Sequence, residues 1–340
     1  MKRIVICADG TWNSPLDDNS SNVLKLSRSI SPIGDDGVNQ MVFYDWGVGS
    51  DTKQMTGGAF GVGLDKNIKD CYRFIVHNYE KGDELYFFGF SRGAYTVRSL
   101  GGFIRNASIL KREHADRIES AFALYKKRTK NSHPDADGSK AFRQNYSVAD
   151  RTEIKFVGVW DTVGSLGVPI SFWGLIEDKH LFHDTEPSSI VKCARHAVSI
   201  DEHRKDFSPT LWDKKDGIDL KQVWFSGCHC DVGGGYPEKG LSDAAFKWIL
   251  DEAKANGLTI EKFVNSYVKP DYKDKIHTEY KKLYRLRGRR FYRPIPEGSL
   301  IHKSALDRFK KDVDGYVKYS NNFERFIDDE GGLGKVTVIN

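Results

Sequence analysis

The segment Gly89-Phe90-Ser91-Arg92-Gly93 places a serine between two glycines in the pattern G-x-S-x-G. In enzymes that transfer acyl groups, this pattern forms a sharp turn from a strand into a helix and holds the serine hydroxyl exposed. The apolar run Glu84–Phe90 precedes the serine, and a segment with helical spacing follows it. The backbone N–H of Arg92 would then point at the negative oxygen of an acyl-transfer intermediate. The pattern and its context predict that Ser91 is a nucleophile.

The proton of such a serine must be taken by a base, which is usually a histidine oriented by a carboxylate. Among the ten histidines, we favour His229, because it follows the apolar segment Leu220–Ser226. We favour Asp161 as the acid, because it ends the next predicted strand after the one that leads to Ser91. The order Ser, Asp, His along the chain is the order found in α/β-hydrolases.

Other residues of the same types are weaker candidates. Asp201 is the alternative acid, since a further strand before it would also place it at the catalytic edge. Asp231 is too close in sequence to the candidate base to be its preferred partner. His196 and His203 are weaker bases, because they fall in or beside Pro187–Ser199, a segment whose spacing predicts a helix.

A polar turn, Asp9-Gly10-Thr11-Trp12, follows the first predicted strand. It would lie beside the active edge, where the backbone N–H of Gly10 or Thr11 is a candidate second donor to the oxyanion. An ordinary polar turn that caps a helix is the alternative interpretation.

Metal and phosphate chemistry receive less support. The run Cys228-His229-Cys230 contains zinc-type ligands, but adjacent residues do not easily supply three of them to one ion, and the sequence has no second cluster. Residues Gly47–Gly63 are predicted to form a glycine-rich loop. Its part Gly57–Gly63 lacks the G-K-[S/T] ending of a phosphate loop and is predicted to be a mobile loop near the mouth of the site. We therefore predict no metal and no cofactor.

Strands and helices alternate along the chain, which predicts a mostly parallel central sheet with helices on both faces. This is an α/β-hydrolase-like fold, with chemistry at the carboxyl ends of the strands. A polar stretch, Asn131–Asp150, is predicted to be a surface loop. We expect a catalytic core over residues 1–255 and a basic, mixed C-terminal extension over residues 256–340 that packs on the core.

The composition limits the classes of partner. The 340 residues include 39% hydrophobic residues, enough for a sizeable core. A net charge of +5 is too small to predict nucleic-acid binding, but it favours peripheral contact with an anionic membrane, as does the basic segment 280–293. There is no long apolar run and no signal-peptide pattern, and the cysteine count of five is odd. These features predict a cytoplasmic protein with reduced thiols, and they are also compatible with secretion that needs no signal peptide.

Four motifs together resemble a family of α/β-hydrolase domains that includes the phospholipase effectors of type VI secretion. The resemblance spans about residues 1 to 250 and implies a Ser-Asp-His triad at Ser91, Asp161 and His229. It also implies hydrolysis of carboxylic esters, with phospholipase A activity in the effector members. The motifs, in order, are Asp9-Gly10-Thr11-Trp12-Asn13, Gly89-Phe90-Ser91-Arg92-Gly93-Ala94, Trp160-Asp161-Thr162-Val163-Gly164 and Phe225-Ser226-Gly227-Cys228-His229-Cys230-Asp231-Val232-Gly233-Gly234.

The sequence therefore predicts a serine esterase or lipase that works through an acyl-enzyme. Its first expected substrate is a phospholipid, and its second is a smaller ester or thioester. Two other interpretations stay open. One is a non-catalytic partner-binding module of the same fold, and the other is a metal-dependent hydrolase that uses the Asp9 and His229 regions.

Overall fold

The structure is a computed structural model that describes residues 1–10, 18–46, 57–127, 129–163, 186–281, 284, 286 and 288–340, with the backbone alone for residues 57–62. In this part of the chain, eight strands form one sheet in the order β2-β1-β3-β4-β5-β6-β7-β8, and every neighbouring pair is parallel. The predicted parallel sheet is confirmed. The strands are β1 Arg3–Ala8, β2 Gln40–Asp45, β3 Glu84–Phe90, β4 Ile154–Trp160, β5 Val191–Ser199, β6 Asp219–Phe225, β7 Leu300–His302 and β8 Val338–Ile339.

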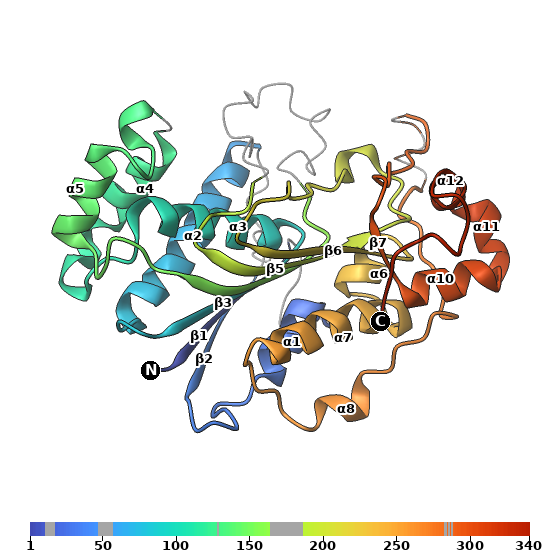
Figure 1. Ribbon diagram of the computed structural model, residues 1–340, viewed down its shortest axis with the longest axis horizontal. Coiled ribbons are helices and arrows are strands. Elements are labelled where there is room, and N and C mark those ends of the chain that lie inside the picture. The colour runs from blue at the N-terminus through green and yellow to red at the C-terminus, as the bar shows by residue number, and fades with distance from the viewer. Residues whose placement is uncertain are drawn as a thin grey trace.

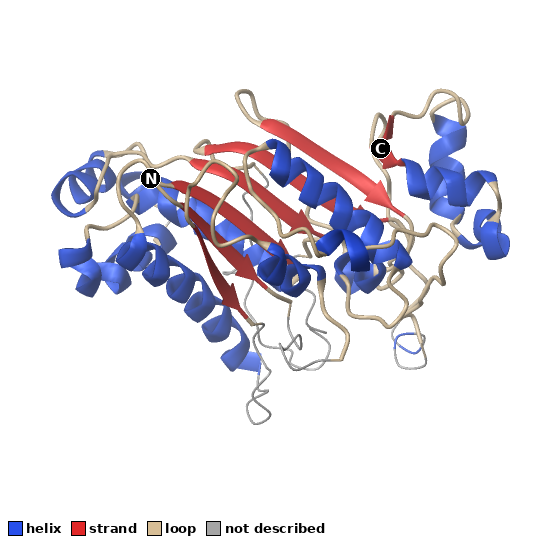
Figure 2. Cartoon of the chain, turned by 90° about the horizontal axis from the view of Figure 1, so that it is seen from below, coloured by secondary structure: helices blue, strands red, loops and turns tan. Residues whose placement is uncertain are grey.

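Helices cover both faces of the sheet, as predicted. Alternate residues of a strand point to opposite faces, so Ile4 and Ile6 of β1 pack in one apolar cluster while Val5 and Cys7 pack in another. The first cluster includes α2, α3 and α4, and the second includes α1 and α7. Figure 1 shows α2 and α3 above the sheet and α1 and α7 below it, and Figure 2 shows the strands running side by side. The helices named here are α1 Asn22–Ser29, α2 Gly57–Asn78, α3 Arg92–Ala107, α4 Ile118–Lys126 and α7 Gly240–Ala255.

The C-terminal region continues the sheet and adds a third apolar cluster. Strand β7 pairs with β6, and the cluster joins Trp224 of β6 to Ile301 of β7 and Phe323 of α12. The predicted division at residue 255 stays a prediction. Other α-helices among the described residues are α5 Asp137–Tyr146, α6 His229–Gly233, α8 Val264–Tyr267, α10 Lys303–Lys310, α11 Tyr316–Tyr319 and α12 Asn321–Asp329.

The strand register aligns the carboxyl ends of the central strands. Phe90 at the end of β3 is paired with Trp160 at the end of β4, and Trp160 is paired with Ala197 of β5. Ser199 at the end of β5 is paired with Phe225 at the end of β6. The residues that follow these strands therefore meet at one edge of the sheet, where open α/β sheets bind ligands.

Three local predictions were wrong. The segment predicted as a helix over Pro187–Ser199 contains strand β5, whose apolar run is interrupted by the buried residues Arg195 and His196. The predicted loop over Asn131–Asp150 contains α5, which is held by the buried Arg143 through carbonyl oxygens of neighbouring segments more than by an apolar stripe. The predicted loop over Gly47–Gly63 becomes helical at Gly57, where α2 begins, while residues 47–56 lie outside the described residues.

None of the described helices combines the length and the apolar character that a membrane-spanning helix needs.

Candidate active site

Ser91 sits in a strained turn between β3 and α3. Its φ is 56° and its ψ is −117°, a backbone conformation that costs energy for a residue with a side chain. Its backbone N–H donates to the carbonyl oxygen of Trp160 at 3.1 Å, which ties the turn to the end of β4. The side chain is largely buried, with 7% of the residue exposed. A strained serine at the carboxyl edge of the sheet is the geometry that G-x-S-x-G predicts.

The two glycines of the motif are required by close packing. A Cβ at Gly93 would lie 2.0 Å from the carbonyl oxygen of Ala8, and a Cβ at Gly89 would lie 2.4 Å from that of Gly93. The start of α3 therefore packs directly against the end of β1. Any side chain at these positions would displace the turn that holds Ser91.

The structure brings Asp161 and His229 together across 68 positions of sequence. The Nδ1–H of His229 donates to Oδ2 of Asp161 at 2.6 Å. Asp161 directly follows β4 and His229 is the first residue of α6. Because a carboxylate only accepts hydrogen bonds, this contact leaves Nε2 of His229 as the proton acceptor of the neutral ring.

Aromatic rings fix the His229 imidazole next to the serine turn. The ring lies 4.6 Å from the ring of Phe90, the residue before Ser91, and 5.1 Å from the ring of Phe207. Burial lowers the pKa of His229 even though Asp161 acts to raise it, so the ring is neutral near pH 7, as a general base must be. In the described part of the chain, Ser91 Oγ and His229 form no hydrogen bond, and such bonds commonly shorten only when substrate binds.

Arg293 is a site residue that the sequence did not reveal. Its guanidinium donates to Oδ1 of Asp161 at 2.6 Å and to Oδ2 at 3.0 Å, and neither side chain is exposed to solvent. The backbone N–H of Ser199 adds another bond to Oδ1 at 2.9 Å. Burial acts to raise the pKa of Asp161, but Arg293 and His229 together hold it well below its usual range. Asp161 is therefore an ionised, fully bonded carboxylate.

Asp201, the alternative acid, contacts no histidine among the described residues. It accepts hydrogen bonds from Ser320 Oγ at 2.5 Å, from Tyr316 Oη at 2.9 Å and from the backbone N–H of Gly227 at 2.7 Å. Burial raises the pKa of Asp201 to about 6. This carboxyl joins α11 and its C-terminal end to the loop that leads into His229.

The two weaker histidine candidates have structural partners. His196 lies on β5 instead of the predicted helix, and its Nε2 accepts the backbone N–H of Thr162 at 3.0 Å. His196 therefore supports the turn just after Asp161. His203 Nδ1 contacts the carbonyl oxygen of Phe291 at 2.9 Å. Burial lowers the pKa of His196 to about 3 and that of His203 to about 4.

The predicted oxyanion donors are placed in part. Arg92 is the first residue of α3, so its backbone N–H lies at the positive end of a helix of 16 residues. The backbone N–H of Gly10 donates to Oδ1 of its neighbour Asp9 at 2.7 Å, an acceptor that competes with an oxyanion. Thr11 lies outside the described residues. The oxyanion roles of these residues stay predictions.

The two cysteines beside His229 are free thiols, of which Cys228 is buried and Cys230 is half-buried. Burial raises the pKa of Cys230 to about 12 and raises that of Cys228 well above its usual range. Within the described residues, no three His, Cys, Asp or Glu side chains converge in a way that would hold a metal ion.

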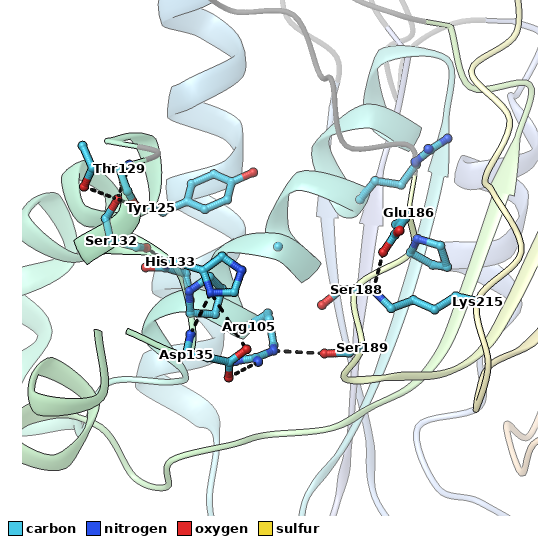
Figure 3. A pocket seen from close by; sticks show the side chains of 15 residues that line it. Arg105, Tyr125, Thr129, Ser132, His133, Asp135, Glu186, Ser188, Ser189 and Lys215 are labelled. Atoms are coloured by element: carbon cyan, nitrogen blue, oxygen red, sulfur yellow. Dashed lines mark hydrogen bonds and ion pairs between the residues drawn. The ribbon is translucent and has the colours of Figure 1, made fainter. Parts of the chain in front are cut away.

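A polar cavity of about 590 Å³ lies beside α3, where Arg98, Gly102, Arg105 and Asn106 line it (Figure 3). Arg105 on its wall is 14 positions beyond Ser91, about 20 Å along a helix. Two of its cations are paired with carboxylates of the same cavity, Arg105 with Asp135 and Lys215 with Glu186. None of Ser91, Asp161 and His229 lines this cavity, so we do not assign it to the acyl chemistry.

Comparisons with known proteins give a relative and two solved structures. An uncharacterized protein of Saccharomyces cerevisiae, YEL023C, is 30% identical over 227 residues, which are 61% of this chain and 32% of the yeast protein. A crystal structure of an uncharacterized protein from Pseudomonas aeruginosa has a TM-score of 0.48 and 19% identity over 80% of this chain and 49% of its own. A structure of the Tle1 effector bound to the VgrG spike of the type 6 secretion system has a TM-score of 0.41 and 18% identity over 70% of this chain and 52% of its own.

This chain thus spans about a third of the yeast relative and about half of each solved chain. A family model described as the catalytic domain of the Tle1-like phospholipase effector of type VI secretion matches residues 2–252, which include the elbow, Asp161 and His229. The chain belongs to this family of Tle1-like phospholipase effector catalytic domains.

Proposed function

We propose that this chain is a serine esterase of the phospholipase type, with Ser91 as nucleophile, His229 as base and Asp161 as the acid that orients His229. The observation that carries the proposal is the 2.6 Å bond from His229 to the buried carboxylate of Asp161, beside a serine held at positive φ. Strain, burial and a pre-oriented imidazole in one place favour a nucleophilic role over a structural one.

The proposed reaction has two halves. Ser91 Oγ attacks the carbonyl carbon of the ester while its proton passes to Nε2 of His229, and the intermediate collapses when that proton is given to the leaving alcohol. Water then attacks the acyl-enzyme with His229 as base, which releases the fatty acid and restores Ser91. The N–H of Arg92 and a donor from the Gly10–Thr11 region are the proposed oxyanion contacts.

A lipid is the proposed substrate class, which the family supports. Two exposed large side chains at the carboxyl side of the sheet also fit a lipid surface: Trp46 directly follows β2, and Tyr292 precedes Arg293, which contacts Asp161. Aromatic and basic residues together favour the boundary of an anionic membrane. Secretion without a signal peptide is part of the proposal and is supported by the family description alone.

The deciding experiment is labelling with a fluorophosphonate probe, followed by assays on phospholipid vesicles and on short acyl esters. We expect wild-type protein to be labelled, Ser91→Ala to lose labelling completely and His229→Ala to be labelled slowly. Ser108→Ala is a matched control, because Ser108 also has positive φ but lies at the other end of α3 with its hydroxyl on Thr152. This control should be labelled like wild type.

Each other outcome points to a different function. Absence of labelling in folded wild-type protein would support a partner-binding module. Ester hydrolysis that survives Ser91→Ala and stops with a chelator would support the metal-dependent interpretation. Cleavage of short esters without cleavage of phospholipid would remove the lipid part of the proposal and keep the serine mechanism.

A further inference from the structure

A buried arginine binds the same carboxylate as the histidine. Arg293 Nη1 and Nη2 contact both oxygens of Asp161, and the same two nitrogens also donate to the carbonyl oxygens of Ser199 at 2.7 Å and Phe207 at 2.5 Å. The guanidinium is thus anchored at four points and has no exposed surface. A planar fork of this kind fixes a carboxylate in position and angle, which a lysine cannot do.

We propose that Arg293 is a positioning residue of the active site, which fixes the Asp161 carboxylate for His229 and thereby sets the pH range of the base. The inference rests on the serine mechanism proposed above for its effect on activity. Its structural part concerns the Asp161–His229 pair and can be tested without any substrate.

The electrostatic consequence follows from the charges around the imidazole. The charged groups that face His229 are Asp161 and Glu202, which favour its protonation, and Arg204, which opposes it. Arg293 is bonded to the same carboxylate as His229, so a proton on the imidazole would bring a second positive charge to Asp161. An arginine in this place keeps His229 neutral to lower pH than Asp161 alone would allow.

Arg293 belongs to the C-terminal region of the chain. The residue lies beyond 252, where the match to the family model ends, and the amide of Asn322 in α12 donates to its carbonyl oxygen at 3.1 Å. The C-terminal region thus provides a direct contact to the proposed acid. It would therefore take part in activity as well as cover the sheet.

The test compares Arg293→Met and Arg293→Lys with wild type in two measurements. The first is the pH dependence of kcat/KM for a short ester. We expect Arg293→Met to move the acid limb about one unit toward higher pH and to lower the plateau about 10- to 100-fold. In Arg293→Lys the acid limb should stay at the wild-type pH, because the positive charge is kept. The plateau value of kcat/KM should fall, because lysine cannot hold the carboxylate at two points.

The second measurement is an NMR titration of His229 in protein with isotope-labelled histidine. We expect a higher His229 pKa in Arg293→Met, whether or not any ester is cleaved. If wild-type protein cleaves no ester and takes up no probe, the serine mechanism fails, and this titration still decides the role of Arg293 toward the Asp161–His229 pair.

Arg308→Met is the matched control. Arg308 is also buried and C-terminal, but its guanidinium donates to the carbonyl oxygens of Tyr272 and Asp274, away from the site. It should lower stability and leave both the acid limb and the His229 titration unchanged. The inference is overturned if Arg293→Met behaves like Arg308→Met in both measurements. If Arg293→Met does not fold, an unchanged plateau rate in Arg293→Lys overturns it.

Discussion

Asp161 and Asp201 are two buried carboxyl groups that follow neighbouring strands of the sheet. Their pKa values are shifted in opposite directions. Asp161 directly follows β4, and Asp201 lies just after the end of β5. Each accepts several hydrogen bonds and has 1% or less of its surface exposed. The donors to Asp161 include a guanidinium and an imidazole, and its pKa is held well below the usual range. The donors to Asp201 are hydroxyls and a backbone N–H, and its pKa is raised to about 6.

The difference shows that burial and position on the sheet do not decide which of the two carboxyls stays ionised. A charged donor offsets the cost of burying an ion, whereas neutral donors offset only part of it. Asp161 therefore keeps the charge that an imidazolium would need in the proposed acyl transfer. Asp201 is suited to joining the C-terminal helices to the loop before His229.

The largest expected effect comes from neutralising each carboxyl in turn. Asp161→Asn should lower kcat by about 10⁴-fold, because the amide no longer selects the tautomer of His229 that can take a proton. Asp201→Asn should cost less than about 10-fold, since an amide can still meet neutral donors. Kinetics on a short ester would check both. Similar losses of kcat in the two variants would contradict the assignment of Asp161 as the acid.

The next largest expected effect is on the free energy of unfolding, and it comes from breaking the buried ion pair between Asp161 and Arg293. Asp161→Leu should destabilise the fold by about 3–5 kcal/mol, because Arg293 is left as an unpaired buried charge. Asp161→Leu combined with Arg293→Met should recover part of that loss. Urea unfolding of wild type, both single variants and the double variant measures the coupling. Strict additivity of the two single changes would contradict a direct pair.

The contributions of Asp161 and Asp201 to stability should change with pH in opposite directions. The folded-state pKa of Asp201 is raised, so its contribution to stability is full below about pH 4 and is lost as the pH rises through about 6, a change of about 3 kcal/mol. The folded-state pKa of Asp161 is lowered, so its contribution is present above about pH 4 and is lost as the pH falls.

Urea unfolding of wild type and Asp201→Asn between pH 4.5 and 7.5 would measure the Asp201 contribution as the difference between two curves. We expect the stability of Asp201→Asn relative to wild type to improve as the pH rises. Parallel curves would show that Asp201 titrates with an ordinary pKa.

The smallest expected effect removes one neutral donor. Tyr316→Phe deletes the hydroxyl that donates to Asp201 at 2.9 Å and should cost about 1 kcal/mol of stability near pH 7. At pH 4.5, where Asp201 is protonated, the cost should be smaller. A larger loss at low pH would mean that Tyr316 stabilises the protonated carboxyl instead.

The sequence predicts the central strands and the elbow well because their signals are local. Glu84–Phe90 is a continuous apolar run, and the steric needs of Gly89 and Gly93 lie within the motif itself. Strand β5 is harder to predict, because the buried Arg195 is satisfied by Asp219 and Glu252, which come from other elements. A single sequence cannot show those partners, so a charged residue indicates a surface.

Arg293 is hidden for the same reason. It lies at the end of a segment rich in lysine and arginine, and its carboxylate partner is 132 positions away. Charge runs usually lie on solvated faces, so nothing in the segment indicates that Arg293 is fully buried. Only the folded chain separates it from its neighbours.

The short strands at the end of the sheet have a practical consequence for expression of this protein. Strand β7 has three residues and β8, which forms the edge of the sheet, has two, and so short an edge strand discourages pairing between molecules. A chain cut after residue 255 would lose both and expose the edge of β6 beside Trp224, which is buried in the intact fold. We expect that fragment to collect in inclusion bodies, so a study of residues 1–255 alone would begin with an aggregation problem.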